Sequence, residues 1–416
     1  MELSCCVQTY AWGKLGSSSE VARLAAGKAC RDFTLKEETN YAELWMGIHP
    51  NGPARIISED QLLSDFIAKN PDCLGSKIQS RFGDTLPFLF KVLSVNKALS
   101  IQAHPNKSHA EQLHAERPSI YKDPNHKPEI AVALTQFEGL CGFRPLEEIK
   151  SFLEAVPELR EVTDHESLLS SSQENYTAQL RLCFESLMTC KPEVLKEQLR
   201  VLESRLSSGS GNDPVSALFL RLHEQYPGDV GCFVIYFLNH LQLSPGEAMF
   251  LGPNVPHAYL AGDCVEVMAN SDNVVRAGLT PKLIDVPTLV NMLDYTCTHP
   301  DTRKFAPDPE LSSDLCLEFD PPVPDFSVGR YEVPGEKDSY QLKVRDTASI
   351  VLVIEGSGKY LASRQITRKG GISVVEPFAS DDISPGSVLF LAADKILEVF
   401  PENCSKLVLF QAYCNL

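Results

Sequence analysis

The sequence predicts a mainly β protein that is interrupted by one block of helices. Three observations lead to this fold class: short apolar runs broken by turn residues over 1–145, apolar residues at helical spacing within 146–230, and strand-like runs from 231 onward. Apolar runs bounded by Gly and Pro are typical of strands, whereas apolar residues three or four apart are typical of amphipathic helices.

The strand-like segments fall into two regions. Before the helical block they are YAELWMGIHP, GPARII, LPFLFKVLSV and GLCGFRP, and after it they resume with GCFVIYFLNHLQL. A proline-rich connector, DPPVPDF at 320–326, precedes ASIVLVIEG, GSVLFLA and KLVLFQAY. We therefore expect 1–145 and 231–319 to form one β region with some helix, and 320–416 to form a C-terminal β-barrel domain.

Residues 146–230 are predicted to form an inserted helical domain. In KPEVLKEQLRVLESRL the apolar residues at helical spacing are Val194, Leu195, Leu199, Leu202 and Leu206. Pro192 suits the first turn of this helix. Asp213 followed by Pro214 predicts another helix start, because an aspartate side chain accepts hydrogen bonds from free backbone N–H groups.

A short internal repeat connects the two β regions. LSPGEAMFLGPNVPHAYL begins at Leu243, and ISPGSVLFLAADKILEVF begins at Ile383. A turn and an apolar strand that occur twice indicate two related barrel halves. Counted from the glycine, His257 of the first copy corresponds to Leu397 of the second, so we expect the C-terminal barrel to lack metal ligands.

Composition excludes several classes of protein. The chain has 416 residues, 43% of them hydrophobic, and its formal net charge of −17 argues against nucleic acid or an anionic membrane as the main partner. No signal-peptide pattern and no apolar run of membrane-spanning length is present. The 13 cysteines include no C-x-x-C pair, which favours reduced thiols over disulfides or a thiolate zinc site. We expect a cytoplasmic monomer.

Two histidines differ from the others, because each lies at a strand end beside proline and apolar residues. In LSIQAHPNK, Gln102 and His104 share one face of a strand, since residues two apart point to the same side. His257 lies in NVPHAYL, and Glu129 precedes another apolar strand. Together these residues would supply two imidazoles, a carboxylate and an amide oxygen. That set suits Zn²⁺, although Mn²⁺ or Fe²⁺ could also use it.

Eight segments, in this order along nearly the whole chain, look like the signatures of one family. They are YAWGK (10–14), YAELWMG (41–47), LPFLFKVLS (86–94), LSIQAHPNK (99–107), DPNHKPE (123–129), GLCGFRP (139–145), NVPHAYL (254–260) and SDNVVRAGLTPK (271–282). In these segments the chain resembles type I mannose-6-phosphate isomerases, also called phosphomannose isomerases, and among them the animal type.

The resemblance implies a fold, an activity and a set of site residues. The fold would consist of cupin-type (jelly-roll) β-barrels with a helical domain inserted in the catalytic part. The activity would be the interconversion of mannose 6-phosphate and fructose 6-phosphate, which supplies mannose for GDP-mannose and glycosylation. The family's ligands for one Zn²⁺ per chain fall on Gln102, His104, Glu129 and His257, and its catalytic arginine falls on Arg276.

The implied reaction moves a proton between C2 and C1 through a cis-enediol(ate), and the sequence leaves the identity of the base open. Lys127, Asp272 and a zinc-bound hydroxide are the alternatives. Arg276 is permanently cationic, so it suits electrostatic stabilisation or positioning better than proton abstraction. Lys127 could instead contact phosphate, and Asp272 could only orient Arg276.

Further residues are expected to contact the substrate. Ser100 and Lys282 are assigned to the phosphate, because a hydroxyl and an ammonium group both suit that dianion. Tyr259 is expected to line the sugar pocket. Trp12 and Trp45 could line the same pocket or pack in the core.

Two other functions deserve comparison with the isomerase. A cupin-like binding protein would retain the metal without turnover, but the presence of both Lys127 and Arg276 disfavours it. A metal oxygenase would use redox-active iron, held by two histidines and one carboxylate. Gln102 as a fourth ligand argues against that site.

Overall fold

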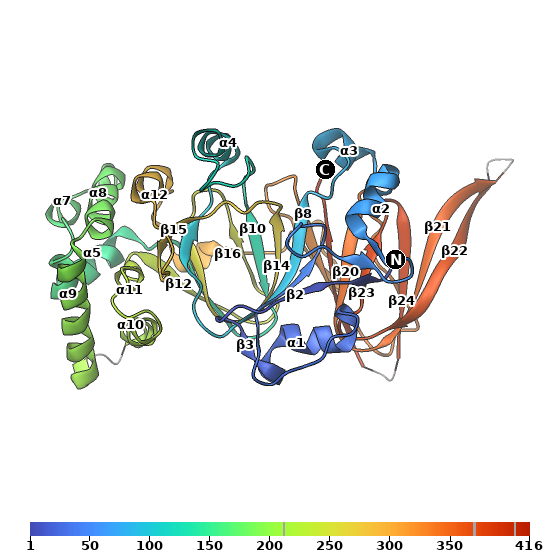
Figure 1. Ribbon diagram of the computed structural model, residues 1–416, viewed down its shortest axis with the longest axis horizontal. Coiled ribbons are helices and arrows are strands. Elements are labelled where there is room, and N and C mark those ends of the chain that lie inside the picture. The colour runs from blue at the N-terminus through green and yellow to red at the C-terminus, as the bar shows by residue number, and fades with distance from the viewer. Residues whose placement is uncertain (211–212, 369–371, 403–404) are drawn as a thin grey trace.

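The computed structural model describes residues 1–210, 213–368, 372–402 and 405–416 and is elongated. A helical part, a central β part and a C-terminal β part follow one another along its long axis (Figure 1). This arrangement confirms the predicted fold class, mainly β with a helical insertion. No helix among the described residues is both long enough and apolar enough to cross a membrane.

The central part is built on one large antiparallel sheet. Its main path runs through β16 (Lys304–Phe305), β13 (Ala248–Leu251), β10 (Glu129–Ala133), β14 (His257–Ala269), β8 (Phe88–Val95), β5 (Glu43–Met46) and β2 (Cys6–Gln8). Beside this path lie β9 (Ile101–Ala103), β11 (Phe137–Phe143), β12 (Leu238–Leu243) and β15 (Val275–Gly278). The long strand β14 pairs with β8, β9, β10 and β11, and so joins the two halves of the sheet.

Strand β8 shows how this sheet separates a core from a cavity. All of its residues are buried, and its side chains alternate between the two faces. Phe90 and Val92 enter a core that also contains residues of the C-terminal strands, such as Phe410. Lys91 and Leu93 point to the opposite face, where they line the cavity described below.

The helical part contains α5 (Leu146–Ala155), α6 (Pro157–Arg160), α7 (Glu166–Leu169), α8 (Tyr176–Met188), α9 (Pro192–Arg205), α10 (Pro214–Gln225) and α11 (Gly231–Val234). Pro192 begins α9, and the carboxylate of Asp213 accepts hydrogen bonds from two backbone N–H groups of α10, as predicted. Val194 does not belong to the buried face of α9, although the helical spacing placed it there. It is 38% exposed, because it lies beside the buried stripe formed by Leu195, Leu199 and Leu202.

An ion-pair network joins the helical part to the large sheet. Glu138 in β11 faces the Nε2 atom of His240 in β12 at 3.3 Å and accepts a hydrogen bond from Arg221 in α10 at 3.2 Å. The hydrogen bond with His240 and the charge of Arg221 lower the pKa of Glu138 to about 2.

The C-terminal part consists of two antiparallel sheets that enclose an apolar core. One contains β17 (Cys316–Phe319), β18 (Ser327–Val333), β25 (Leu407–Tyr413), β20 (Ser349–Glu355) and β23 (Val388–Leu391). The other contains β19 (Tyr340–Gln341), β24 (Lys395–Pro401), β21 (Gly358–Arg368) and β22 (Ile372–Ile383). The hairpin of β21 and β22 projects from the end of the molecule (Figure 1).

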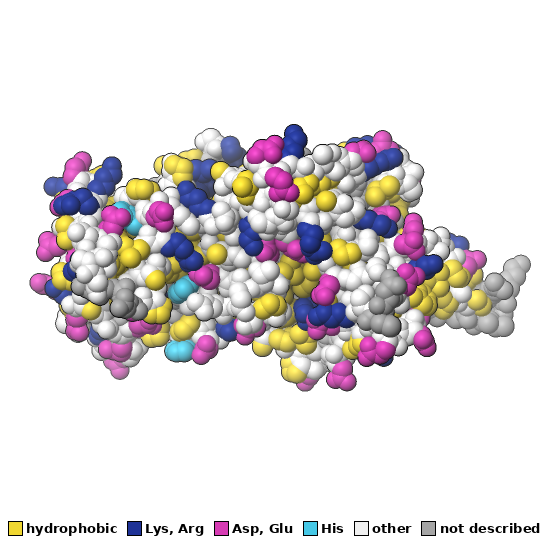
Figure 2. Space-filling view, turned by 90° about the horizontal axis from the view of Figure 1, so that it is seen from below, with side chains coloured by type: hydrophobic (Ala, Val, Ile, Leu, Met, Phe, Trp, Pro, Cys, Tyr) yellow, Lys and Arg dark blue, Asp and Glu magenta, His cyan; other side chains and the backbone are white. Residues whose placement is uncertain are grey.

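The remaining elements are short and lie around these parts. They are the strands β1 (Leu3–Ser4), β3 (Lys14–Leu15), β4 (Asn40–Tyr41), β6 (Arg55–Ile56) and β7 (Gln61–Leu62), and the helices α1 (Glu20–Leu24), α2 (Leu63–Lys69), α3 (Ser76–Phe82), α4 (Lys107–Glu116) and α12 (Val286–Met292). Figure 2 shows basic and acidic side chains mixed over one long face, rather than gathered into a basic surface.

The internal repeat of the sequence is also a repeat of structure. Gly246 and Gly386 have φ angles of +89° and +91°, which a glycine adopts without strain. The N–H of Gly246 donates to Ala133 in β10 at 2.8 Å, and that of Gly386 donates to Val353 in β20 at 2.9 Å. The two turns therefore lead into β13 and β23 in the same way.

Candidate metal centre

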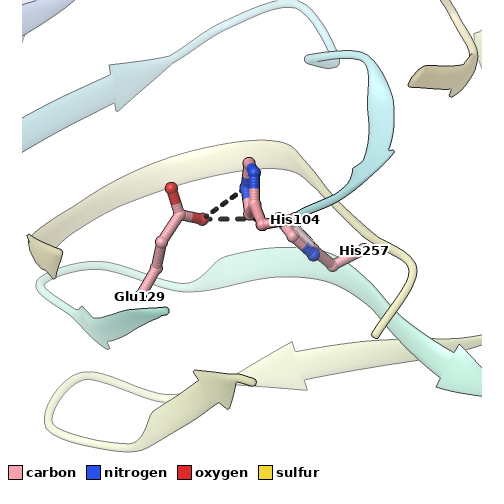
Figure 3. Close-up of side chains that lie close together, drawn as sticks. All are labelled: His104, Glu129 and His257. Atoms are coloured by element: carbon pink, nitrogen blue, oxygen red, sulfur yellow. Dashed lines mark ion pairs between the residues drawn. The ribbon is translucent and has the colours of Figure 1, made fainter. Parts of the chain in front are cut away.

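Two imidazoles and one carboxylate converge in the interior of the central part (Figure 3). Glu129 begins β10, His257 begins β14, and His104 directly follows β9. The Nε2 atoms of His104 and His257 lie 3.5 Å and 3.3 Å from the same oxygen of Glu129. All three side chains are buried, and their ligand atoms lie within 4.8 Å of one another.

Hydrogen bonds fix the orientation of both imidazole rings. The Nδ1 atom of His104 lies 2.6 Å from the carbonyl oxygen of Asn273, and that of His257 lies 2.8 Å from the carbonyl oxygen of Val255. A carbonyl only accepts, so each Nδ1 carries the proton and each Nε2 presents a lone pair. Neither Nε2 has a hydrogen-bond donor within the described residues. A cation between these two lone pairs and the carboxylate would satisfy all three groups, so these residues fit a metal ion.

The protonation states also suit a metal. Burial lowers the pKa of His104 to about 4, which keeps its imidazole neutral. Burial alone would raise the pKa of Glu129, but the ammonium group of Lys127 and the neighbouring imidazoles outweigh it and hold that pKa well below its ordinary value. A neutral imidazole and an ionised carboxylate are the forms that bind Zn²⁺.

The fourth predicted ligand, Gln102, lies in β9 directly opposite both His257 and Arg276 in the strand pairing. Its side-chain oxygen accepts a hydrogen bond from the hydroxyl of Ser100 at 3.1 Å. Ser100 and Gln102 share a face of this segment, as the alternation predicts, and both line the same cavity. The role of Gln102 as a ligand stays a prediction.

That cavity has a volume of about 550 Å³. It brings together the sequence-predicted residues Ser100, Gln102, Lys127, Glu129, Tyr259, Asp272, Arg276 and Lys282. Trp12 and Trp45, which the sequence left undecided, line it as well. His104 and His257 do not line it but lie buried at Glu129. Segments from six regions of the chain therefore meet around one space.

Two basic side chains of this cavity are free of carboxylate partners. Within the described residues, neither Arg276 nor Lys282 forms an ion pair or a side-chain hydrogen bond. Partial burial lowers the pKa of Arg276, but an arginine stays cationic throughout the physiological range. Uncompensated positive charge at the wall of a cavity favours an anionic ligand.

Lys127 and Asp272 lie in different electrostatic surroundings. The Nζ atom of Lys127 is 3.3 Å from Glu129, so the ammonium group has an anionic neighbour. Asp272 lies 3.4 Å from Nε2 of His49, and this contact lowers the pKa of the Asp272 carboxyl despite its partial burial. The backbone N–H of Asn51 donates to Nδ1 of His49, so Nε2 carries the proton that faces Asp272.

Sequence patterns did not identify His49 or a network of buried charges in the wall of the cavity. Lys91 lies between two carboxylates, 3.0 Å from Glu266 and 3.5 Å from Glu43. Glu266 also accepts a hydrogen bond from the hydroxyl of Tyr259 at 2.7 Å. Burial raises the pKa of Tyr259 well above its ordinary value, so its hydroxyl remains a donor. The sequence did contain one signal for this network, the single lysine in the middle of the apolar strand FLFKVLSV. Burying an unpaired charge is costly, so such a lysine indicates buried carboxylate partners.

The loop that contains Lys127 is anchored by side-chain contacts to two other segments of the chain. Asp123 accepts hydrogen bonds from the hydroxyl of Ser271 and the backbone N–H of Asp272, each at 2.8 Å. His126 turns the other way and lies 3.1 Å from Asp325 in the connector before β18. The loop therefore links the segment that carries Asp272 to the start of the C-terminal part.

Comparisons with known proteins agree with this architecture. The chain matches family models described as phosphomannose isomerase type I: the catalytic domain over 1–146, the helical insertion domain over 156–238 and the C-terminal model over 317–365. Mannose-6-phosphate isomerases from Mus musculus and Homo sapiens are each 48% identical to it, over 100% of this chain and 98% of theirs.

Solved structures give the same result. The apo form of mannose 6-phosphate isomerase from Salmonella typhimurium is similar with a TM-score of 0.80 and 34% identity, covering 100% of this chain and 99% of that one. A mannose 6-phosphate isomerase bound with zinc and yttrium gives the same values. This likeness confirms the predicted cupin-type fold. At this identity and coverage, the chain belongs to the type I phosphomannose isomerase family of enzymes.

Proposed function

We propose that this member of the family is a zinc-dependent isomerase that interconverts mannose 6-phosphate and fructose 6-phosphate. The observation that carries the proposal is one cavity whose wall contains two chemically different groups of residues. One group is Glu129, with the unsatisfied imidazole nitrogens beside it, and the other is Arg276 and Lys282, which have no ion-pair partner among the described residues. Its volume of about 550 Å³ is of the size that encloses a small ligand.

The two groups divide the work of binding and catalysis. The ammonium group of Lys282, with the hydroxyl of Ser100, would hold the phosphate. Binding energy at the phosphate fixes the position of the reacting carbons, which carry no charge of their own. Gln102, His104, Glu129 and His257 would hold one Zn²⁺, which supplies positive charge for the oxygens on C1 and C2.

The isomerisation needs a group that takes a proton from one carbon and returns it to the next. We propose Asp272 as the base, because its lowered pKa leaves it ionised and it faces the cavity. His49 would orient this carboxylate by donating from Nε2. Lys127, an ammonium group beside Glu129, would donate to a substrate oxygen, and Arg276 would stabilise the negative charge of the enediolate.

The test is a coupled assay that measures fructose 6-phosphate formed from mannose 6-phosphate, with and without a chelator. Turnover that a chelator abolishes and added zinc restores would support the proposal, while chelator-insensitive isomerisation would contradict the zinc mechanism. Metal binding without turnover would indicate the binding-protein alternative, and oxygen consumption would indicate an oxygenase. Asp272→Asn and Lys127→Met, each with zinc content verified, should both lower kcat strongly, and near-normal rates would remove either residue from the proton path.

The remaining parts of the proposal concern the setting of the enzyme. We propose that it acts in the cytoplasm as a monomer and supplies mannose for GDP-mannose and glycosylation. The free thiols of all the described cysteines are in keeping with a reducing compartment. We also propose catalytic segments at 1–145 and 231–319, a helical insertion at 146–230 and a C-terminal domain at 320–416.

A further inference from the structure

Asp229 connects the helical part to the wall of the cavity. It lies between α10 and α11, just before the chain returns to the central sheet. Its Oδ1 atom accepts hydrogen bonds from the backbone N–H groups of Gly231 at 2.7 Å and Leu279 at 2.6 Å. Its Oδ2 atom accepts from the backbone N–H of Thr280 at 3.0 Å. One carboxylate therefore binds three backbone groups, two of them in the turn that follows β15.

That turn has a conformation that needs support. Leu279 has a φ angle of +51°, in the left-handed region that a branched apolar side chain disfavours. The chain also approaches itself closely, because a Cβ atom on Gly278 would lie 2.5 Å from the Cα atom of Gly231. The two N–H groups that this turn leaves free both point to Asp229, so the carboxylate stabilises a strained backbone.

The turn carries the cationic wall of the cavity. Arg276 precedes it in β15, Lys282 follows it, and the backbone N–H of Lys282 donates to the hydroxyl of Thr280 at 3.1 Å. Neither cation is held by a carboxylate of its own within the described part of the chain. Their positions therefore depend on the backbone of 276–282, and Asp229 binds that backbone at its centre.

We propose that Asp229 is a positioning residue that sets the 276–282 segment for the phosphate of the substrate. This inference rests on the proposed function, because it assigns the phosphate of the ligand to Lys282. It also gives the helical insertion a role in the reaction, since the insertion contributes the carboxylate that shapes the site. Asp229 does not line the cavity, so it acts through the turn and is not a catalytic residue.

Asp229→Asn tests the proposal with little change of shape. The amide keeps an oxygen for Gly231 and Leu279 but turns a donor toward the N–H of Thr280. Since a hydrogen bond to a charged group is lost, we expect KM for mannose 6-phosphate to rise about tenfold while kcat changes less than about twofold. The inhibition constant of inorganic phosphate should rise by a similar factor, whereas zinc content should not change.

A matched control is available in the same part of the chain. Asp213→Asn removes the charge of another aspartate that accepts from two backbone N–H groups, Val215 and Ser216, at the start of α10. Asn is an equally good cap, so KM and kcat should stay near the wild-type values. A double-mutant cycle adds a readout that a general loss of stability would not move: in the Lys282→Ala background, Asp229→Asn should raise KM much less than it does alone.

Several results would overturn the inference. These are an unchanged KM and phosphate inhibition constant in Asp229→Asn, equal changes in KM for Asp213→Asn, or full additivity with Lys282→Ala. If Asp229→Asn does not fold, Thr280→Val decides, because it keeps the shape of this side chain in the cavity wall and removes the hydroxyl that accepts from the Lys282 N–H; a raised KM supports the inference and an unchanged KM refutes it. A wild-type enzyme without turnover of mannose 6-phosphate would instead refute the proposed function.

Discussion

Replacing Glu129 by glutamine should separate the stability of the fold from the stability that a metal adds. The carboxylate faces two imidazole nitrogens that present lone pairs at 3.5 Å and 3.3 Å. In Glu129→Gln the side-chain NH₂ group can donate to one of these nitrogens. The amide oxygen can still face the ammonium of Lys127, which lies 3.3 Å from the other carboxylate oxygen. The variant therefore loses a charge but gains a donor that the zinc-free site lacks.

The magnitudes follow from these contacts. A buried acceptor without a donor costs about 1–3 kcal/mol, and the amide removes one of two such penalties. This gain offsets the weakened ion pair with Lys127, so the zinc-free variant should be within about 1 kcal/mol of the zinc-free wild type. Zinc at a thousandfold excess over its Kd stabilises the wild type by about 4 kcal/mol. A ligand loss that weakens zinc binding about a hundredfold should reduce this gain by about 2.8 kcal/mol.

Urea unfolding, followed by circular dichroism with a chelator and with added zinc, measures both quantities. Glu247→Gln is the matched control. Glu247 pairs with Lys304 at 2.8 Å at the edge of the same sheet, and it is not one of the proposed metal ligands. Its response to zinc should equal that of the wild type. Equal stabilisation by zinc in Glu129→Gln and wild type would refute the assignment of Glu129 as a ligand. A zinc-free Glu129→Gln that is several kcal/mol less stable would refute the reasoning about the lone pairs.

Three further perturbations test other parts of the structure. The folded-state pKa of Glu138 is about 2 against an ordinary 4.5, so its ionised form stabilises the fold above pH 4.5 and this contribution is lost as the pH falls toward 2. Glu138→Gln should therefore lose less stability than the wild type between pH 6 and pH 3 in urea unfolding, a difference of about 1 kcal/mol after solvent screening. Lys91→Met should lower the free energy of unfolding by about 3 kcal/mol, because it leaves Glu266 buried without its cation; an unchanged urea midpoint would contradict this. Gly246→Ala should cost about 1 kcal/mol for its positive φ, and Gly386→Ala should cost clearly more in thermal unfolding, because its Cβ would lie 2.1 Å from a backbone oxygen; equal costs would contradict the packing argument.

Local patterns in the sequence predicted the elements of the fold well where the physics is local. The helix that begins at Pro192 and the cap at Asp213 follow from chemistry within a few residues, and both are confirmed. The repeated turn was visible because the same φ requirement selects glycine at 246 and 386. Val194 shows the limit, because helical spacing does not fix which edge of an apolar face meets the neighbouring helices. The domain boundaries stay a prediction.

The site could be predicted as far as its residues carry a motif. His104, Glu129 and His257 lie far apart in the chain, and spacing alone was a weak signal for a shared metal; the resemblance brought them together, and the structure places them side by side. His49 has no such signal, because its meaning comes from Asp272, which lies more than two hundred residues further along. Contacts of this kind depend on how the strands pair, and no local sequence pattern specifies that pairing.

The two copies of the repeat show which polar residues the sheet itself requires. Glu129 in β10 and Ser349 in β20 have the same register against the strand that follows the repeated turn. Glu266 in β14 and Gln411 in β25 then occupy equivalent positions two residues further along the pairing. In the second copy Gln411 donates to Ser349 at 3.0 Å and accepts from Arg345 at 3.3 Å, and Arg345 in turn pairs with the buried carboxylate of Glu318. A sheet of this design thus folds without a carboxylate at the positions of Glu129 and Glu266. Because the strand pairing itself does not require a carboxylate at either position, we expect Glu129 and Glu266 to serve the cavity that both side chains line rather than the pairing of the strands.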